Sequence, residues 1–147
     1  MIISNKCLEL VKHYEGFYEE AYLDPVGIIT IGYGTIRYEN GTKVKLGDTC
    51  NEEEALMWLS YEIESNIHNL EGLNINQNQI DALMSFIYNC GSGNFNSSTL
   101  KKKIRINPDD KTIGYEFSRW NKAGGKVLNG LTKRRKAEYI LYSTMNE

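Results

Sequence analysis

Apolar residues near the amino terminus recur every three or four positions, as on one face of a helix: Cys7, Leu8, Val11 and Tyr14. Ser4 or Asn5 can cap such a helix, because their side chains accept hydrogen bonds from the first free backbone N–H groups. Gly16 can end it, because glycine adopts the backbone conformations that follow a helix. The pattern therefore predicts a helix over residues 4–15.

Short β signals follow this helix. Residues 17–23 are rich in aromatic side chains, and residues 28–33 combine β-branched and aromatic ones, which predicts two strands. Between them, residues 24–27 read Asp-Pro-Val-Gly, the composition of a type I turn. A third strand is expected over residues 35–38, closed by Glu-Asn-Gly at 39–41. These strands predict a small sheet that needs another element to pack against.

A long helical pattern begins near residue 50. Thr49 and Glu52 have the spacing of a capping box, and Gly72 can end the helix. A helix is therefore expected to about Leu70. Its apolar stripe would comprise Ala55, Leu56, Leu59, Ile63, Ile67 and Leu70.

The rest of the chain is helical in pattern. One helix is expected from Asn76 to the break at residues 91–93, with a stripe of Ile80, Leu83, Met84 and Ile87. Ser97 or Ser98 starts a short basic helix with apolar Leu100, Ile104 and Ile106, and another helix is expected over residues 115–120. Glycines at 124, 125 and 130 mark a loop. The last helix is expected over residues 131–145, with Ala137, Ile140 and Leu141 facing inward.

This order of elements predicts a mostly helical α+β fold in a single domain, residues 1–147. We expect an α/β lobe over residues 1–50, with a small antiparallel sheet. A connecting helix over residues 51–71 would join it to a helical lobe over residues 72–147. Two lobes joined by a helix leave a cleft, and clefts between lobes are preferred ligand sites.

Composition narrows the class of protein. The chain has 147 residues, of which 41% are hydrophobic and 24% charged, as in ordinary globular domains. No run is long enough to span a membrane, and the amino terminus lacks the pattern of a secretory signal. The three cysteines and two histidines are too scattered for a disulfide framework or a metal site. Trp58 and Trp120 are expected in the core, and no cofactor is predicted.

Charge is unevenly distributed along the chain. Residues 1–72 carry 5 Lys/Arg and 13 Asp/Glu, whereas residues 73–147 carry 12 and 6. A basic half, with runs at residues 101–105 and 133–136, suggests a partner with negative groups on one side. Solvated helix faces would give the same counts, so both interpretations stay open.

The surroundings expected for Glu15 and Asp24 favour opposite protonation states of their carboxyl groups. Glu15 is expected at a helix C-terminus, where the macrodipole and aromatic neighbours disfavour a carboxylate. Asp24 opens a turn whose N–H groups stabilise its ionised form. Two carboxyl groups whose surroundings favour opposite protonation states can serve as an acid and a base, as glycoside hydrolysis requires. Such turns and helix ends also occur without catalytic roles, and the residues alone leave this open.

The segment resembles the catalytic signature of the phage-type lysozymes, or endolysins, of glycoside hydrolase family 24. That signature is Glu, eight residues, Asp or Cys, five residues and Thr, and it falls here on Glu15, Asp24 and Thr30. The resemblance continues in order along nearly the whole chain. It includes Tyr14, Gly16, Tyr22 and residues 31–35, 79–83, 85–86, 88–91, 120–125 and 130–138.

The resemblance implies hydrolysis of the β-1,4 bond between N-acetylmuramic acid and N-acetylglucosamine in bacterial peptidoglycan, with inversion. Glu15 would protonate the leaving oxygen as general acid. Asp24 and Thr30 would hold the attacking water, and Asp24 would take its proton. Arg134 corresponds to a position near the catalytic glutamate. A guanidinium there would favour ionised Glu15, against the helix-end effect, and the sequence leaves the balance open.

Further residues are expected to bind substrate. Tyr33, Gly34 and Ile36 would line the cleft on the sheet side, where Gly34 lets a sugar approach the backbone. On the helical side, N-acetyl groups could bond to the following residues: Tyr88, Asn89 and the pair Ser98 and Thr99. Core packing and helix capping are equally supported roles for these residues.

The expected partner is the peptidoglycan glycan strand, without nucleic acid and without stable membrane insertion. We expect a monomer, made in the cytoplasm of the host bacterium, that reaches the periplasmic wall through a holin-type pore and lyses the cell. Two alternatives stay open: a module that binds glycan without cleaving it, and a transglycosylase that forms anhydro ends.

Overall fold

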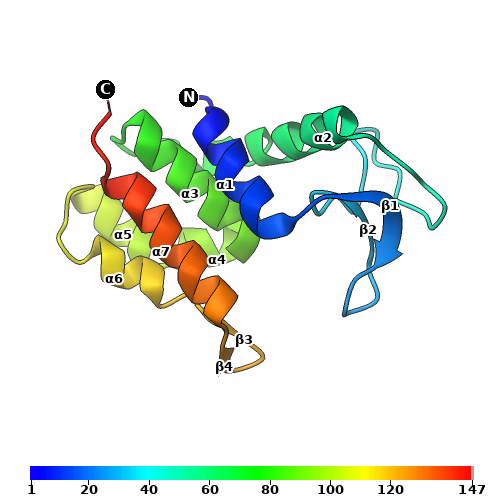
Figure 1. Cartoon of the computed structure of the whole chain (residues 1–147). Helices are drawn as coiled ribbons and strands as arrows, with labels where there is room; N and C mark the ends of the chain where they lie inside the picture. Colours follow the sequence, from blue (N-terminus) through cyan, green and yellow to red (C-terminus); the bar gives the residue numbers. More distant parts are fainter. Residues whose placement is uncertain (147) are drawn as a thin grey trace.

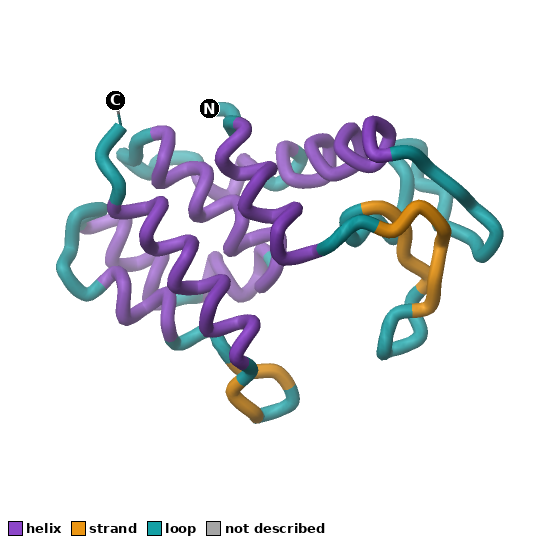
Figure 2. Tube along the Cα trace, in the orientation of Figure 1, coloured by secondary structure: helices purple, strands orange, loops and turns teal. Residues whose placement is uncertain are grey.

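A computed structural model describes residues 1–146 and shows a helical lobe beside a smaller sheet lobe (Figures 1 and 2). Helix α2 runs along one side and leads from the sheet lobe back to the helices (Figure 1). The elements follow in the order α1 (Asn5–Glu15), β1 (Tyr18–Leu23), β2 (Ile29–Gly32), α2 (Glu52–Glu64), η1 (Ile67–Leu70), α3 (Gln77–Cys90), α4 (Ser92–Ser97), α5 (Thr99–Ile106), α6 (Ile113–Ser118), β3 (Lys122–Ala123), β4 (Lys126–Val127) and α7 (Asn129–Ser143).

Helix α1 begins and ends where the sequence predicts. The Ser4 side chain accepts a hydrogen bond from the Lys6 backbone N–H at 3.3 Å, and Asp81 of α3 accepts from the Ser4 N–H at 2.7 Å. Gly16 ends the helix with φ 75°, and its N–H donates to the Lys12 carbonyl. Glu15 is therefore fixed at the last position of a helix that is anchored at its other end.

Strands β1 and β2 form an antiparallel hairpin with Tyr22 opposite Thr30. The expected turn is present, and the Gly27 N–H donates to the Asp24 carbonyl at 2.9 Å. The expected third strand is wrong. Residues 31 and 35 exchange two backbone hydrogen bonds around a tight turn, so residues 35–38 make isolated bridges instead of a strand.

Helix α2 is shorter than the expected helix. Its capping box joins Asn51 to Glu54, not Thr49 to Glu52. It ends at Glu64 instead of Leu70, and a 3₁₀ turn, η1, follows. Ser65 and Asn66 explain this end: both side chains donate to the Glu62 carbonyl, at 2.7 and 3.1 Å, and such bonds favour helix termination.

Helix α3 is the centre of the helical lobe. It is buried from Asn78 to Ile87 and packs against α1, α4 and α7. Phe86 of α3 contacts the rings of Phe95, Phe117 and Trp120 in the core. Helix α4 begins inside the segment expected to be a break. The loop expected at Gly124, Gly125 and Gly130 is instead the turn of the β3–β4 hairpin followed by the first residues of α7.

The buried face of α7 differs most from the prediction. Ile140, expected to face inward, is 57% exposed, and Ala137 and Leu141 are half-buried. Ile106 of α5 is likewise exposed. The buried residues of α7 are instead mostly charged: Arg134, Arg135, Glu138 and Tyr142. Within residues 1–146, no helix is both long and apolar enough to cross a membrane.

Candidate active site

Glu15 lies where α1, α3 and α7 approach one another. Its Oε2 atom is 2.6 Å from Nη1 of Arg134, near the start of α7, and its side chain keeps 23% of its exposure. Arg134 is itself 3% exposed. The arrangement holds one oxygen of the Glu15 carboxyl in place and leaves the other free. This is the contact expected for Arg134 from the family resemblance.

Arg134 is held by buried groups behind it. Glu138, one turn later on α7 and 0% exposed, lies 3.4 Å from Arg134 Nε and 2.8 Å from Arg135 Nε. Ser85 of α3 donates its hydroxyl proton to Glu138 at 2.6 Å. Burial raises the pKa of Glu138, and the two guanidinium groups oppose that effect. The buried charges therefore form a rigid support for the carboxyl that Arg134 contacts.

The second oxygen of Glu15 faces the backbone of Gly34. A Cβ atom at Gly34 would lie 3.1 Å from Glu15 Oε1 and 3.1 Å from the Tyr88 hydroxyl. That hydroxyl donates to the Tyr33 carbonyl at 3.0 Å, so its oxygen can accept a hydrogen bond from another group. Gly34, Tyr88 and Arg134 thus surround Glu15 from three different elements of the chain.

Replacing Gly34 by alanine is expected to lower wall-hydrolysing activity at least tenfold. The new methyl group would displace Glu15 or Tyr88, in addition to the strain of an alanine at φ 92°. Gly72→Ala is the matched control, because Gly72 has φ 82° and nothing within 4 Å of an added Cβ. Turbidity assays and thermal melts of both variants separate contact from strain. Equal activity losses in the Gly34 variant and the control would contradict the claim that the added methyl group acts by contacting Glu15 or Tyr88.

Glu62 of α2 is a neighbour of Glu15 that the sequence analysis missed. Burial and, after it, the negative charge of Glu15 raise the pKa of Glu62, and a polar contact with the Tyr88 hydroxyl opposes the rise. Burial and the charges of Glu62 and Glu15 likewise raise the pKa of Tyr88. Two carboxyl groups therefore flank one tyrosine hydroxyl. The only sequence signal for Glu62 is its place beside Ile63 in the apolar stripe of α2.

Asp24 lies in the turn that joins β1 to β2. Its Oδ1 accepts hydrogen bonds from the backbone N–H groups of Val26 at 2.9 Å and Ile28 at 2.8 Å, as predicted for a turn aspartate. Within residues 1–146, Oδ2 has no hydrogen-bond partner. Burial raises the pKa of Tyr22 most, and Tyr18 and the negative charges of Asp24 and Glu15 add to the rise. Tyr22 is thus near both carboxyl groups.

Thr30 lies opposite Tyr22 on β2 and is 5% exposed. Its hydroxyl donates to the Ile28 carbonyl at 3.1 Å. Among the described residues, none donates to its oxygen, so Oγ1 can still accept a hydrogen bond from water. Ile28 thus connects the two side chains: its N–H binds Asp24 and its carbonyl binds Thr30.

Three residues expected at the cleft have other roles. The Tyr33 ring is buried in the core and its hydroxyl donates to Glu52 at 2.9 Å, so only its backbone faces Tyr88. Ser98 is 4% exposed and caps α5, accepting from the Lys101 N–H and donating to the Phe95 carbonyl. Asn89 accepts from Arg135 at 2.9 Å. Of the remaining expected residues, Ile36 is 46% exposed and lines a groove beside α2.

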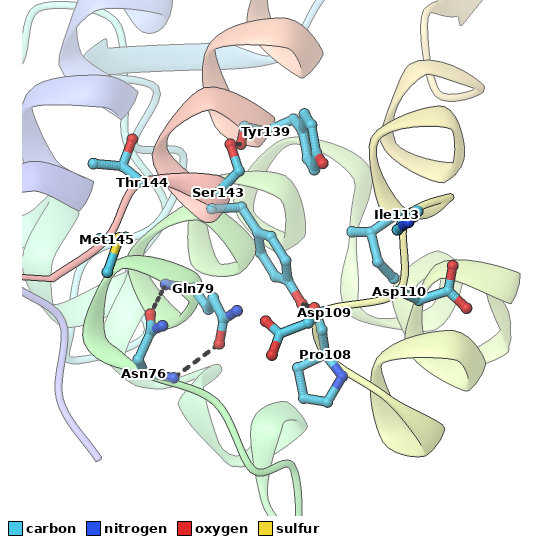
Figure 3. Close-up of a pocket in the computed structure, with 12 residues that line it drawn as sticks. Asn76, Gln79, Pro108, Asp109, Asp110, Ile113, Tyr139, Ser143, Thr144 and Met145 are labelled. Atoms are coloured by element: carbon cyan, nitrogen blue, oxygen red, sulfur yellow. Dashed lines mark hydrogen bonds between the residues drawn. The ribbon is translucent and has the colours of Figure 1, made fainter.

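A separate pocket lies at the opposite end of α3 and α7 (Figure 3). Asn76 and Gln79 from the start of α3 face Tyr139, Ser143 and Thr144 from the end of α7, around a volume of about 280 Å³. Tyr88 and Arg134 lie at the other ends of these two helices. This pocket therefore has no contact with the carboxyl groups described above.

Comparison with known proteins agrees with this geometry. Residues 12–138 match the family model described as "Phage lysozyme". The chain is 37% identical, over 98% of its length, to the endolysin of Bacillus phage B103, of which it spans 55%. It is 36% identical, again over 98%, to the endolysin of Acyrthosiphon pisum secondary endosymbiont phage 1, of which it spans 99%.

A solved structure extends the comparison to the fold. The endolysin from Escherichia coli O157:H7 phage FAHEc1 superposes with a TM-score of 0.89 at 35% identity, covering 97% of this chain and 94% of that one. The mostly helical α+β fold with small antiparallel sheets is therefore that of the phage lysozymes. The chain belongs to the phage lysozyme family, a family of glycoside hydrolases.

Proposed function

We propose that this protein is a muramidase that hydrolyses the β-1,4 bond between N-acetylmuramic acid and N-acetylglucosamine in peptidoglycan, and thereby lyses the host cell. The observation that carries the proposal is the Glu15 carboxyl. One of its oxygens is held by Arg134, and the other is open beside the backbone of Gly34. An acid so oriented can deliver a proton to an oxygen that lies against Gly34.

In the proposed reaction Glu15 is the general acid. Its proton passes from Oε1 to the glycosidic oxygen as the bond from that oxygen to the muramic acid C1 breaks. The electron pair of that bond stays with the leaving N-acetylglucosamine. Arg134 remains on Oε2, and its partner Glu138 balances part of its charge, so the carboxyl is held in both protonation states.

Asp24 and Thr30 bind and orient the attacking water molecule. The free Oδ2 of Asp24 and the acceptor oxygen of Thr30 can each bind one hydrogen of a water molecule, whose oxygen lone pair then attacks C1. Asp24 takes the proton as the new bond forms. Attack from the face opposite the leaving group inverts the anomeric configuration, which is the outcome of a carboxylate acting through water.

Replacing Asp24 by asparagine is expected to lower the rate of wall hydrolysis about 100-fold without unfolding the turn, because an amide oxygen still accepts the two N–H groups but is a poor base. The assay is release of reducing ends from purified peptidoglycan. Asp110→Asn is the matched control, since Asp110 accepts the Thr112 N–H in an exposed turn of the helical lobe. Full activity of the Asp24 variant would contradict its role as base.

The partner and route are also proposals. Peptidoglycan as the substrate is supported by the relatives named as endolysins. Synthesis in the host cytoplasm, a monomeric state and passage to the wall through a holin-type pore stay predictions.

A further inference from the structure

A groove beside the candidate site lies between α2 and the loop of residues 36–41. It encloses about 280 Å³, which suits a single ring better than a long ligand. Its walls combine aromatic and polar side chains: Tyr38, Trp58, Tyr61, Glu39, Glu62 and Ser65. Tyr61 is 49% exposed, and Trp58, expected in the core, is half-buried. The rings of Tyr61 and Trp58 on α2 are therefore partly exposed to solvent in this groove.

The loop that forms the other wall is held in place. The Tyr38 hydroxyl donates to Asp48 at 2.8 Å, and the Tyr38 and Trp58 rings lie 4.9 Å apart. Arg37 donates to the Gly41 carbonyl at 2.7 Å, which closes the turn. These contacts fix the width of the groove before any ligand binds, so a ligand would meet a formed surface.

Glu62 connects the groove to the candidate active site. It lines the groove and also faces Tyr88 and Glu15. Within residues 1–146 neither Glu62 nor Glu39 forms an ion pair, so both carboxyl groups can accept hydrogen bonds from a ligand. The groove therefore begins where the surroundings of Glu15 end.

We propose that this groove is a subsite for one N-acetylhexosamine ring of the same glycan strand, beside the rings that flank the cleaved bond. The ring would stack on Tyr61, and its hydroxyl groups would donate to Glu62 and Glu39. Exposed aromatic faces suit the apolar C–H face of a pyranose, and unpaired carboxylates suit neutral hydroxyl donors but repel the carboxylates of stem peptides. The inference rests on the proposed glycan substrate.

The test measures binding of a linear pentamer of N-acetylglucosamine, which carries no peptide. Calorimetry in a Glu15→Gln background avoids cleavage of the probe. Adding Tyr61→Ala is expected to weaken binding about tenfold, whereas Tyr61→Phe keeps the ring and most of the affinity. Tyr115→Ala, at a ring that is 64% exposed on α6, is the control and should change nothing.

Two results would overturn the subsite. Equal affinities for the Tyr61→Ala and Tyr115→Ala proteins would show that the groove does not bind the glycan. In a second titration of the same variants with peptide-bearing muropeptides, a loss of affinity confined to those ligands would show that the groove binds stem peptide instead. A separate measurement tests the proposed function itself. If that function were wrong, the unaltered protein would release no reducing ends from peptidoglycan, whatever its affinity for the pentamer.

Discussion

Replacing Glu15 by glutamine is expected to lower the rate of wall hydrolysis about 100- to 10,000-fold, the contribution of a general acid. Glutamine has nearly the same shape and its amide oxygen can still accept a hydrogen bond from Arg134. It cannot deliver a proton to the glycosidic oxygen. The fold should stay intact, because Glu15 is a half-buried residue at a helix end. Turbidity loss of chloroform-treated Gram-negative cells measures the rate.

Glu9→Gln is the matched control for this change. Glu9 lies on the same helix, and its side chain is 72% exposed beside Lys12. The amide should leave both activity and stability almost unchanged, since exposed ion pairs contribute about 0–1 kcal/mol. A Glu15→Gln protein as active as the Glu9→Gln protein would remove Glu15 from the reaction.

Replacing Glu138 by leucine is expected to lower the free energy of unfolding by about 3–5 kcal/mol, the cost of leaving a buried charge without its partner. Leucine has a similar volume, so the loss would not come from a cavity. Arg134 and Arg135, 3% and 1% exposed, would face an apolar group. Urea denaturation measures the change. Activity should fall as well, because Arg134 loses the support that positions it against Glu15.

Glu116→Leu is the matched control for Glu138→Leu, because it also replaces one buried carboxylate but lies outside the cluster of Arg134, Arg135 and Glu138. Glu116 is 4% exposed and also has two cationic partners. Those partners, Lys103 and Arg119, have side chains that are 29% and 53% exposed and can turn to water. The loss should therefore be smaller, about 1 kcal/mol, and activity should be retained. Equal losses of stability and activity in both variants would contradict a positioning role for Glu138.

Local chemistry explains which parts of the fold could be predicted from sequence. The cap at Ser4, the glycine at position 16 and the turn at residues 24–27 each depend on a few neighbouring residues, and all three are confirmed. The third strand was wrong because residues 31–35 close a tight turn that strand propensity does not report. Local patterns thus predicted the positions of Glu15 and Asp24 well.

Contacts between distant segments explain what the sequence could not show. An apolar stripe was expected inside α7, yet Arg134 and Arg135 are buried there, where both form ion pairs with Glu138 and Arg134 also donates to Ser85. The spacing of Glu138, four residues after Arg134 and three after Arg135, was a usable signal for that cluster. No spacing indicates that Glu62 approaches Glu15, because α2 and α1 meet only in the folded chain.

The central claim is that water, activated by Asp24 and Thr30, attacks the muramic acid C1. Mass spectrometry of muropeptides released from purified peptidoglycan in ¹⁸O-labelled water tests it most directly. Hydrolysis by this mechanism is expected to give reducing N-acetylmuramic acid ends that carry one ¹⁸O atom. Unlabelled 1,6-anhydro ends would show that no water enters the product and would contradict it.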